Sequence, residues 1–324
     1  MLNMTMRAVQ VSRPGGPLEL VECPLPEPGP GEVRITVQAC GICHSDSVTK
    51  DGLFPGIRYP IIPGHEVTGV IDKLGEGVIA WRVGQRVGVG WFGSHDAEIT
   101  GVTRDGGYAE AMTASAGALA AIPDDLSAIE AAPMLCAGNA TFTALRRCGA
   151  AAGDLVAIQG VGGLGHLALQ FAARMGFKVV AIDRGRDREP LARQLGAHHY
   201  IDAEVETVSE ALKAMGGARI ILAVHDNAAA MSAAVDGLTA DGCLLVLGVP
   251  EAPLTIPSRL LLSGRSVAGS QAGPASASEA TMAFSTLVNV RPMVEVMPLE
   301  NAAEAYDRMV RGQARFRIVL ATGL

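Results

Sequence analysis

Aromatic residues are scarce in this chain of 324 residues, because Phe, Trp and Tyr together make up only 4% of it. A surface that stacks single-stranded nucleic acid depends on such rings. The net charge of −7 also repels a phosphate backbone, and no basic stripe offsets it. The composition therefore argues against nucleic acid as a partner.

Long apolar runs and cysteines are also few. No window reaches the roughly 20 apolar residues of a membrane span, and residues 1–7 lack the regions of a secretion signal. Six cysteines in a chain of this length do not form a disulfide scaffold. We therefore expect a cytoplasmic protein without a membrane partner, in which Cys23, Cys148 and Cys243 are buried, inert thiols.

Glycine and apolar residues, in contrast, are plentiful. The chain has 39 glycines and 49% hydrophobic residues, and its length suggests about two domains. The first half has strand character at residues 33–39 and 67–74, and we expect a C-terminal helix at 299–311 before a strand at 316–320. From about residue 144, strands are predicted at 155–159, 178–182, 220–224 and 243–247, and helices at 167–175, 189–195 and 228–238. This alternation predicts an α/β fold with a doubly wound parallel sheet.

A glycine-rich turn stands between the first of these strands and the helix that follows it. Its residues are Gly160, Val161, Gly162, Gly163, Leu164 and Gly165, which fit G-x-G-x-x-G. In that setting the glycines allow a tight turn and a close approach of a pyrophosphate to a helix N-terminus. A plain surface loop is the alternative, but strand, turn, helix, strand and acid occur here in the expected order.

The acid is Asp183, 183 − 165 = 18 residues after the last glycine. Its carboxylate can accept hydrogen bonds from ribose hydroxyls and repel a 2′-phosphate, which favours NAD over NADP. Arg184, Arg186 and Arg188 crowd the same loop and leave the opposite preference open.

Soft metal ligands gather in three places: Cys43 with His44, His65 with Glu66, and Cys136. A catalytic zinc takes three protein ligands of this kind and keeps a fourth position open. Spacing alone does not bring the three together, and the C-x-x-C at Cys40 and Cys43 also fits a redox pair or half of a zinc ribbon.

These motifs, taken in order, resemble the zinc-containing alcohol dehydrogenases of the medium-chain dehydrogenase/reductase superfamily, in particular its bacterial and yeast-like branch. The matching stretches are GICHSD (41–46), PGHEVTG (63–69), DGGYAE (105–110), APMLCAG (132–138), the glycine turn with His166, LGA (195–197) and FRIVL (316–320). The resemblance implies a β-rich GroES-like catalytic domain, residues 1–143 completed by 275–324, a Rossmann domain at 144–274, and a homodimer or homotetramer.

The resemblance also implies roles for single residues. Cys43, His65 and Cys136 look like the zinc ligands, with Glu66 as an occasional ligand, Ser45 as the hydroxyl that passes the substrate proton and Asp46 as the carboxylate that orients His65. Cofactor contacts are implied for His44 and Arg317 at the pyrophosphate, Arg188 at the adenosine ribose and Val249 at the nicotinamide amide, while Trp91 resembles a pocket-lining aromatic.

The implied activity is hydride transfer between NAD(H) and a small alcohol, aldehyde or ketone. Two alternatives stay open: an NADPH-linked reductase of an activated C=C bond or carbonyl, and a catalytically weak cofactor-binding protein.

The chain departs from the family in three respects. The bridge from residue 92 to 104 contains no cysteine, where the family carries a four-cysteine lobe, so one zinc per chain and no structural zinc is expected. Val48 replaces a histidine that usually extends the proton relay. Near the nicotinamide, Ala140 replaces a threonine and Val224 with His225 replaces small residues, although His225 also fits a solvent-facing loop.

Overall fold

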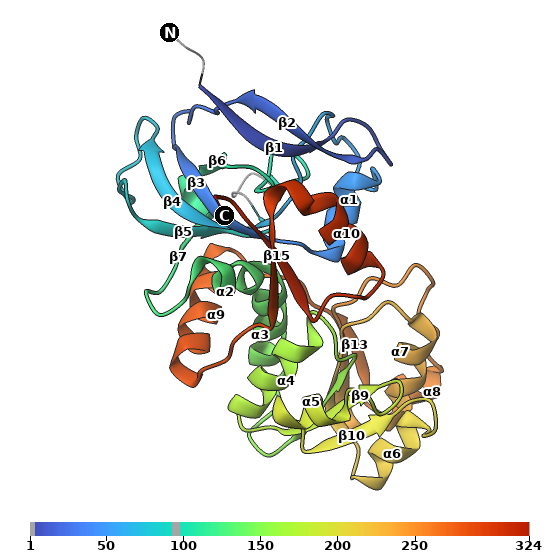
Figure 1. Ribbon diagram of the computed structural model, residues 1–324. Coiled ribbons are helices and arrows are strands. Elements are labelled where there is room, and N and C mark those ends of the chain that lie inside the picture. The colour runs from blue at the N-terminus through green and yellow to red at the C-terminus, as the bar shows by residue number, and fades with distance from the viewer. Residues whose placement is uncertain (1–3, 93–97, 324) are drawn as a thin grey trace. The chain divides into compact units, whose positions relative to one another are not determined.

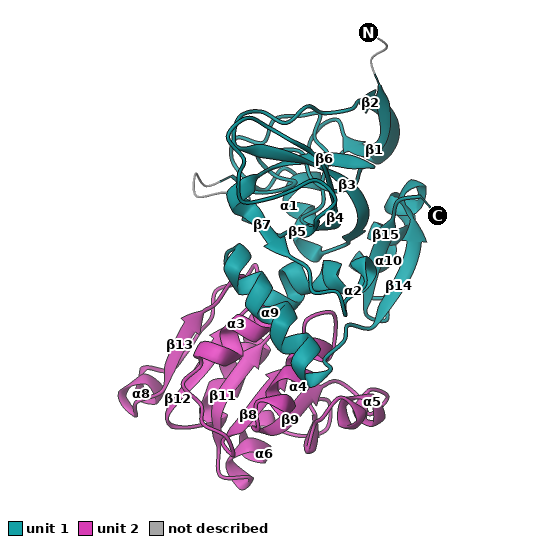
Figure 2. Cartoon of the chain, turned by 90° about the vertical axis from the view of Figure 1, so that its left-hand side faces the viewer, with its two compact units in different colours: residues 1–139, 273–324 teal, residues 140–272 magenta. Residues whose placement is uncertain are grey.

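The computed structural model describes residues 4–92 and 98–323. The chain divides into two compact units (Figures 1 and 2). Unit 1 contains residues 1–139 and 273–324, drawn in teal in Figure 2, and unit 2 contains residues 140–272, drawn in magenta. No helix in the described residues is long and apolar enough to cross a membrane.

The described part of unit 2 is built on a parallel sheet with the strand order β10-β9-β8-β11-β12-β13. In chain order this is 3-2-1-4-5-6, so the predicted doubly wound sheet is confirmed. Its centre is fully buried: all five residues of β8 are buried. The strands are β8 (Leu155–Gln159), β9 (Lys178–Asp183), β10 (His199–Asp202), β11 (Ala218–Ala223), β12 (Leu238–Val246) and β13 (Ser266–Gly269).

Helices connect these strands. Because the strand order reverses at β8, right-handed connections place helices on both faces of the sheet. The helix expected at 228–238 is shorter than predicted: it ends at Ala234, and β12 already begins at Leu238. The residues between them, Val235–Gly237, form a 3-10 turn, and Gly237 packs against α6, where a Cβ would lie 2.8 Å from Leu212 Cδ1. The helices are α4 (Gly165–Arg174), α5 (Glu189–Gln194), α6 (Val208–Ala214), α7 (Ala228–Ala234) and α8 (Ser258–Leu262).

Unit 1 is β-rich, as expected for a GroES-like domain. Its described residues form a sheet with the order β14-β15-β3-β4-β5-β7, in which β6 also pairs with β3, and a separate β1-β2 hairpin. Alternate residues of β3 and β4 enter the core, and Val33, Ile35, Val67 and Ile71 are fully buried. The strands are β1 (Thr5–Val11), β2 (Leu18–Pro24), β3 (Glu32–Gly41), β4 (Glu66–Leu74), β5 (Arg86–Val89), β6 (Ala111–Ser115), β7 (Leu119–Ala121), β14 (Val294–Pro298) and β15 (Arg317–Ala321).

The C-terminal segment completes this sheet, since β15 pairs in parallel with β14 and antiparallel with β3. The helix α9 (Ala275–Val288) was not predicted, because its Ala- and Ser-rich sequence carries little contrast between a polar and an apolar face. Asn289 ends it in the left-handed conformation, with φ 55°. The other helices are α1 (Ser47–Lys50), α2 (Ala128–Pro133), α10 (Ala302–Val310) and α3 (Asn139–Arg147), which begins at the division between the units.

Candidate metal centre and nucleotide site

Cys43 is fixed by the turn that follows β3. The turn His44–Asp46 is a single 3-10 turn, and the backbone N–H of Cys43 donates to Asp46 Oδ2 at 2.9 Å. Cys43 is only 4% exposed, whereas His44 is exposed and Ser45 is half-buried. The short turn therefore directs the thiol inward and leaves the next two side chains nearer to solvent.

His65 and Glu66 lie where the chain enters β4. Gly64 precedes them with φ +98°, and a Cβ on it would lie 2.4 Å from the ring of Tyr108. Only glycine suits both the left-handed backbone and this close contact. The turn buries His65 and Glu66, which are 1% and 0% exposed.

Cys136 comes from a third element, the π-helical segment Met134–Gly138, which continues α2. Such segments are rare and occur often at functional sites, because the extra residue redirects a side chain. Here the segment carries Cys136 to the other two ligands.

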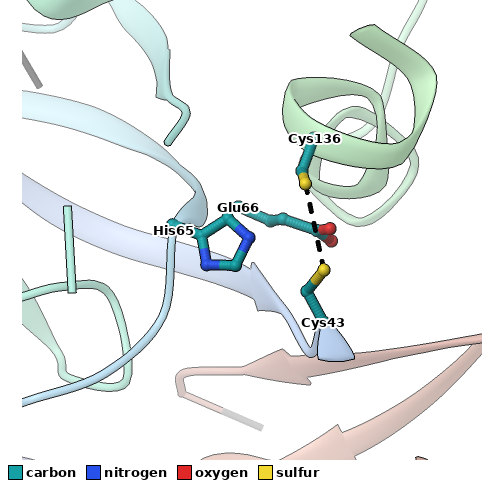
Figure 3. Close-up of side chains that lie close together, drawn as sticks. All are labelled: Cys43, His65, Glu66 and Cys136. Atoms are coloured by element: carbon teal, nitrogen blue, oxygen red, sulfur yellow. Dashed lines mark hydrogen bonds between the residues drawn. The ribbon is translucent and has the colours of Figure 1, made fainter. Parts of the chain in front are cut away.

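The four candidate ligands converge within unit 1 (Figure 3). One ligand atom each from Cys43, His65, Glu66 and Cys136 lies within 4.8 Å of the others. The two sulfur atoms are 3.9 Å apart, and two thiolates that bind one tetrahedral zinc at about 2.3 Å each are separated by about 3.8 Å. The His65 Nε2 atom is buried without a hydrogen-bond partner. The donor set therefore fits a zinc ion.

A hydrogen-bond chain behind His65 fixes its ring. Nδ1 lies 3.0 Å from Asp46 Oδ1, and the Tyr108 hydroxyl donates to Asp46 Oδ2 at 2.7 Å. With a carboxylate at Nδ1, that nitrogen keeps its proton, and Nε2 is the atom that would bind a metal once its own proton is lost. Trp91 packs edge-on against the ring, with centroids 4.8 Å apart.

The same burial perturbs the ionisation of the ligands. Burial lowers the pKa of His65, but the charge and hydrogen bond of Asp46 outweigh it and hold the pKa well above its usual value. The hydrogen bond between the Cys43 and Cys136 sulfur atoms lowers the pKa of Cys43 and raises that of Cys136. One thiolate is thus already favoured in the protein alone.

Glu66 has a partner of its own. Its Oε1 accepts from Arg317, which is itself 4% exposed and also donates to the Ile42 carbonyl. Burial raises the pKa of Glu66 to about 7, although Arg317 opposes the shift, and Oε2 has no partner. Gly41 provides the room, because a Cβ there would lie 1.9 Å from Oε2.

The glycine turn of unit 2 joins β8 to α4. A Cβ on Gly165 would lie 1.8 Å from the Gly160 carbonyl oxygen, so the turn excludes any larger residue there. Nothing lies within 4 Å of the Cβ position of Gly162. Open space above a backbone that begins a helix fits the approach of a phosphate group.

Asp183 ends β9 beside this turn. Its Oδ2 accepts from the Val161 N–H and from Arg188, both at 2.8 Å, and its Oδ1 accepts from the Arg184 N–H. Asp183 therefore stabilises the glycine turn by a hydrogen bond, in addition to lying next to it. The spacing of the motif does not reveal this structural role. Val249, after β12, is 87% exposed.

Three features of the sites were missing from the sequence-based predictions: the Tyr108 hydroxyl behind Asp46, the space at Gly41, and the pairing of Arg317 with Glu66. All three residues lie in stretches that resemble the family, at 41–46, 105–110 and 316–320, but these stretches alone do not reveal the contacts that the residues make.

The architecture, a GroES-like β unit with a Rossmann unit, is that of the medium-chain dehydrogenases/reductases. The alcohol dehydrogenase GroES-like domain family matches residues 29–124, and the zinc-binding dehydrogenase family matches residues 163–287. The structure of acetophenone reductase from Geotrichum candidum in complex with NAD superimposes with a TM-score of 0.86 at 25% identity, covering 99% of this chain and 98% of that one.

Two relatives identify the family more closely. Alcohol dehydrogenase notN of Aspergillus sp. (strain MF297-2) is 39% identical over 98% of both chains. The NADP-dependent alcohol dehydrogenase C of Mycobacterium bovis is 33% identical over 91% of this chain and 92% of its own. The chain belongs to the zinc-type alcohol dehydrogenase family of the medium-chain dehydrogenase/reductase superfamily.

Proposed function

We propose that the protein is an oxidoreductase that uses one zinc ion to transfer a hydride between NAD(H) and a small alcohol, aldehyde or ketone. The observation that carries the proposal is the convergence of Cys43, His65 and Cys136, with His65 Nε2 buried and unpartnered. An inert cofactor-binding protein has no need for such a donor set.

Unit 1 would supply the substrate site. Cys43, His65 and Cys136 would hold the zinc, which supplies Lewis-acid polarisation of the substrate oxygen. Ser45, half-buried two residues after Cys43, would take or return the substrate proton. Val48 in α1 carries no group that continues this relay, so the proton would leave Ser45 by way of a cofactor hydroxyl or water.

Unit 2 would be the dinucleotide-binding domain, with the rest of the chain as the catalytic domain. Its glycine turn would hold the pyrophosphate at α4, and Asp183 would face the adenosine ribose, so we propose NAD as the preferred cofactor. Arg188 would stay with Asp183 near that ribose, and Val249 would meet the nicotinamide amide through its backbone. From unit 1, His44 would contact the pyrophosphate. Arg317 would be the second contact with the pyrophosphate from unit 1.

We also propose a homodimer or homotetramer. Among the described strands of unit 2, β13 lies at one edge of the sheet and is mostly exposed, and nearby Leu262 is 88% exposed. An open strand edge with exposed apolar neighbours favours pairing with another chain. Light scattering on the purified protein would give the assembly, and a strict monomer would contradict this part.

The test of the function is a substrate panel of alcohols, aldehydes, ketones and enals, run with NADH or NAD⁺ and with their phosphorylated forms. Turnover of simple aldehydes or alcohols with NAD(H), lost on chelation and restored by zinc, is the expected result. Activity confined to enals would indicate C=C reduction, a preference for NADPH would contradict the role of Asp183, and cofactor binding without turnover would contradict the proposal as a whole.

A further inference from the structure

Tyr108 is a fully buried tyrosine with a hydrogen bond directed toward the metal centre. Its exposed fraction is 0%, and its hydroxyl donates to Asp46 Oδ2 at 2.7 Å. A buried hydroxyl without an acceptor is costly, so this bond fixes the hydroxyl as well as the carboxylate.

The Asp46 carboxylate has three described partners. Oδ2 accepts from Tyr108 and from the Cys43 N–H, while Oδ1 lies 3.0 Å from His65 Nδ1. Because Oδ2 is held from two directions, the carboxylate plane cannot rotate freely, and Oδ1 stays aligned with the imidazole. The orientation of the His65 ring therefore depends on the two groups that donate to Asp46 Oδ2.

The backbone around Tyr108 is tied to the segment that carries His65. The N–H groups of residues 106, 107 and 108 donate to the carbonyls of residues 62, 64 and 63, at 2.7, 2.9 and 3.0 Å. The Tyr108 ring also covers Gly64, whose missing side chain leaves the space for it. These contacts fix the position of the Tyr108 side chain relative to the segment that carries His65.

We propose that Tyr108 is a positioning residue of the metal centre, which locks Asp46 so that His65 presents Nε2 to the zinc in one fixed orientation. This inference rests on the proposed zinc site and deepens it. Partners beyond the ligands commonly change metal affinity by about 10–100-fold, and Tyr108 acts one hydrogen bond further out, so an effect near the lower end is expected.

The experiment compares zinc release from the wild-type holoenzyme, Tyr108→Phe and Tyr59→Phe. The Tyr108→Phe variant keeps the ring that fills the space over Gly64 and loses only the hydroxyl. Tyr59 provides the control, because its hydroxyl donates to the Thr49 carbonyl at 2.5 Å in the same unit and not to Asp46. Transfer of zinc to a colorimetric chelator should be about tenfold faster for Tyr108→Phe and unchanged for Tyr59→Phe.

Two further measurements separate positioning from a structural role. The cobalt-substituted Tyr108→Phe protein should show an altered visible absorption band, whereas its metal-free form should melt close to the metal-free Tyr59→Phe protein. In an Asp46→Asn background, Tyr108→Phe should have little additional effect on zinc release, because the two residues act in series.

Zinc release at the wild-type rate with an unchanged cobalt spectrum would overturn the inference, as would effects of Asp46→Asn and Tyr108→Phe that simply add. A wild-type protein that binds no zinc would instead contradict the proposed function, so the two failures are distinguishable.

Discussion

The two units build their candidate sites in opposite ways. The glycine turn and Asp183 of unit 2 lie within one strand-turn-helix-strand segment, residues 155–183, and are joined by bonds such as the one from Val161 to Asp183. The metal centre of unit 1 collects residues 43, 65, 66 and 136, and the Arg317 side chain reaches it from the last strand. The geometry of the local site is set by the residues of one turn. The geometry of the dispersed site is set by the folding of the whole sheet, because its residues come from separate elements.

The largest expected effect comes from removing one ligand of the dispersed site. Cys43→Ser should reduce bound zinc to a small fraction per chain and lower turnover by about a thousandfold, because the metal supplies several kcal/mol of stabilisation to the reaction. Binding of NADH, followed by its fluorescence, should persist, since the glycine turn is unchanged. Cys148→Ser in unit 2 is the control, with zinc and turnover kept. Loss of NADH binding in Cys43→Ser would mean that the sites are not separable.

The local site can be tested by two glycine substitutions that differ in what surrounds them. Gly162→Ala adds a methyl group to open space. It should change stability by less than about 0.5 kcal/mol, yet weaken cofactor binding by about tenfold or more, because the methyl stands where the phosphates approach. Gly165→Ala should instead destabilise unit 2, since its methyl collides with the Gly160 carbonyl.

Calorimetry and cofactor titration measure both effects of these substitutions. In both variants, the zinc content should stay near that of the wild type. Unchanged cofactor affinity in a well-folded Gly162→Ala protein would remove the phosphate role of this turn.

The smallest expected effect concerns how the C-terminal segment is held in unit 1. Burial raises the pKa of Glu295, but hydrogen bonds from Arg308 and from the Arg315 N–H outweigh it, so the pKa lies below its usual value. A depressed carboxyl pKa stabilises the folded state above the unfolded value near 4.5, and this contribution disappears as the pH falls through the folded value.

Glu295→Gln should therefore cost about 1 kcal/mol at pH 7 and progressively less below about pH 4.5, as measured by chemical unfolding over that range. Asp307→Asn, an exposed carboxylate at 3.9 Å from Arg311, provides the comparison and should show little change. A deficit that stays constant with pH would show that packing, and not charge, is what Glu295 contributes.

Local pattern was sufficient for much of unit 2. The pattern of strands and helices predicted the parallel sheet and four of its six strands, because each step depends on neighbours in the sequence; β10 and β13 were not predicted. The errors were also local in origin: α7 gives way to a 3-10 turn after Ala234, and α9 was missed because it lacks an amphipathic pattern.

The metal centre, in contrast, could not be predicted from local pattern. Residue types alone left Cys43 open to a redox or zinc-ribbon interpretation, and only the resemblance to a family assembled it with His65 and Cys136. Nothing in the sequence predicts that Gly41 makes room for Glu66 or that Arg317 pairs with it, since both depend on β3, β4 and β15 meeting in one sheet.

The proposed single zinc site is tested most directly by zinc analysis of the purified protein combined with X-ray absorption at the zinc edge. We expect one zinc per chain, bound by two sulfur atoms and by nitrogen or oxygen for the remainder, from Cys43, Cys136 and His65 with an exchangeable position. Two zinc ions per chain, no zinc, or a site with four sulfur ligands would contradict the proposal.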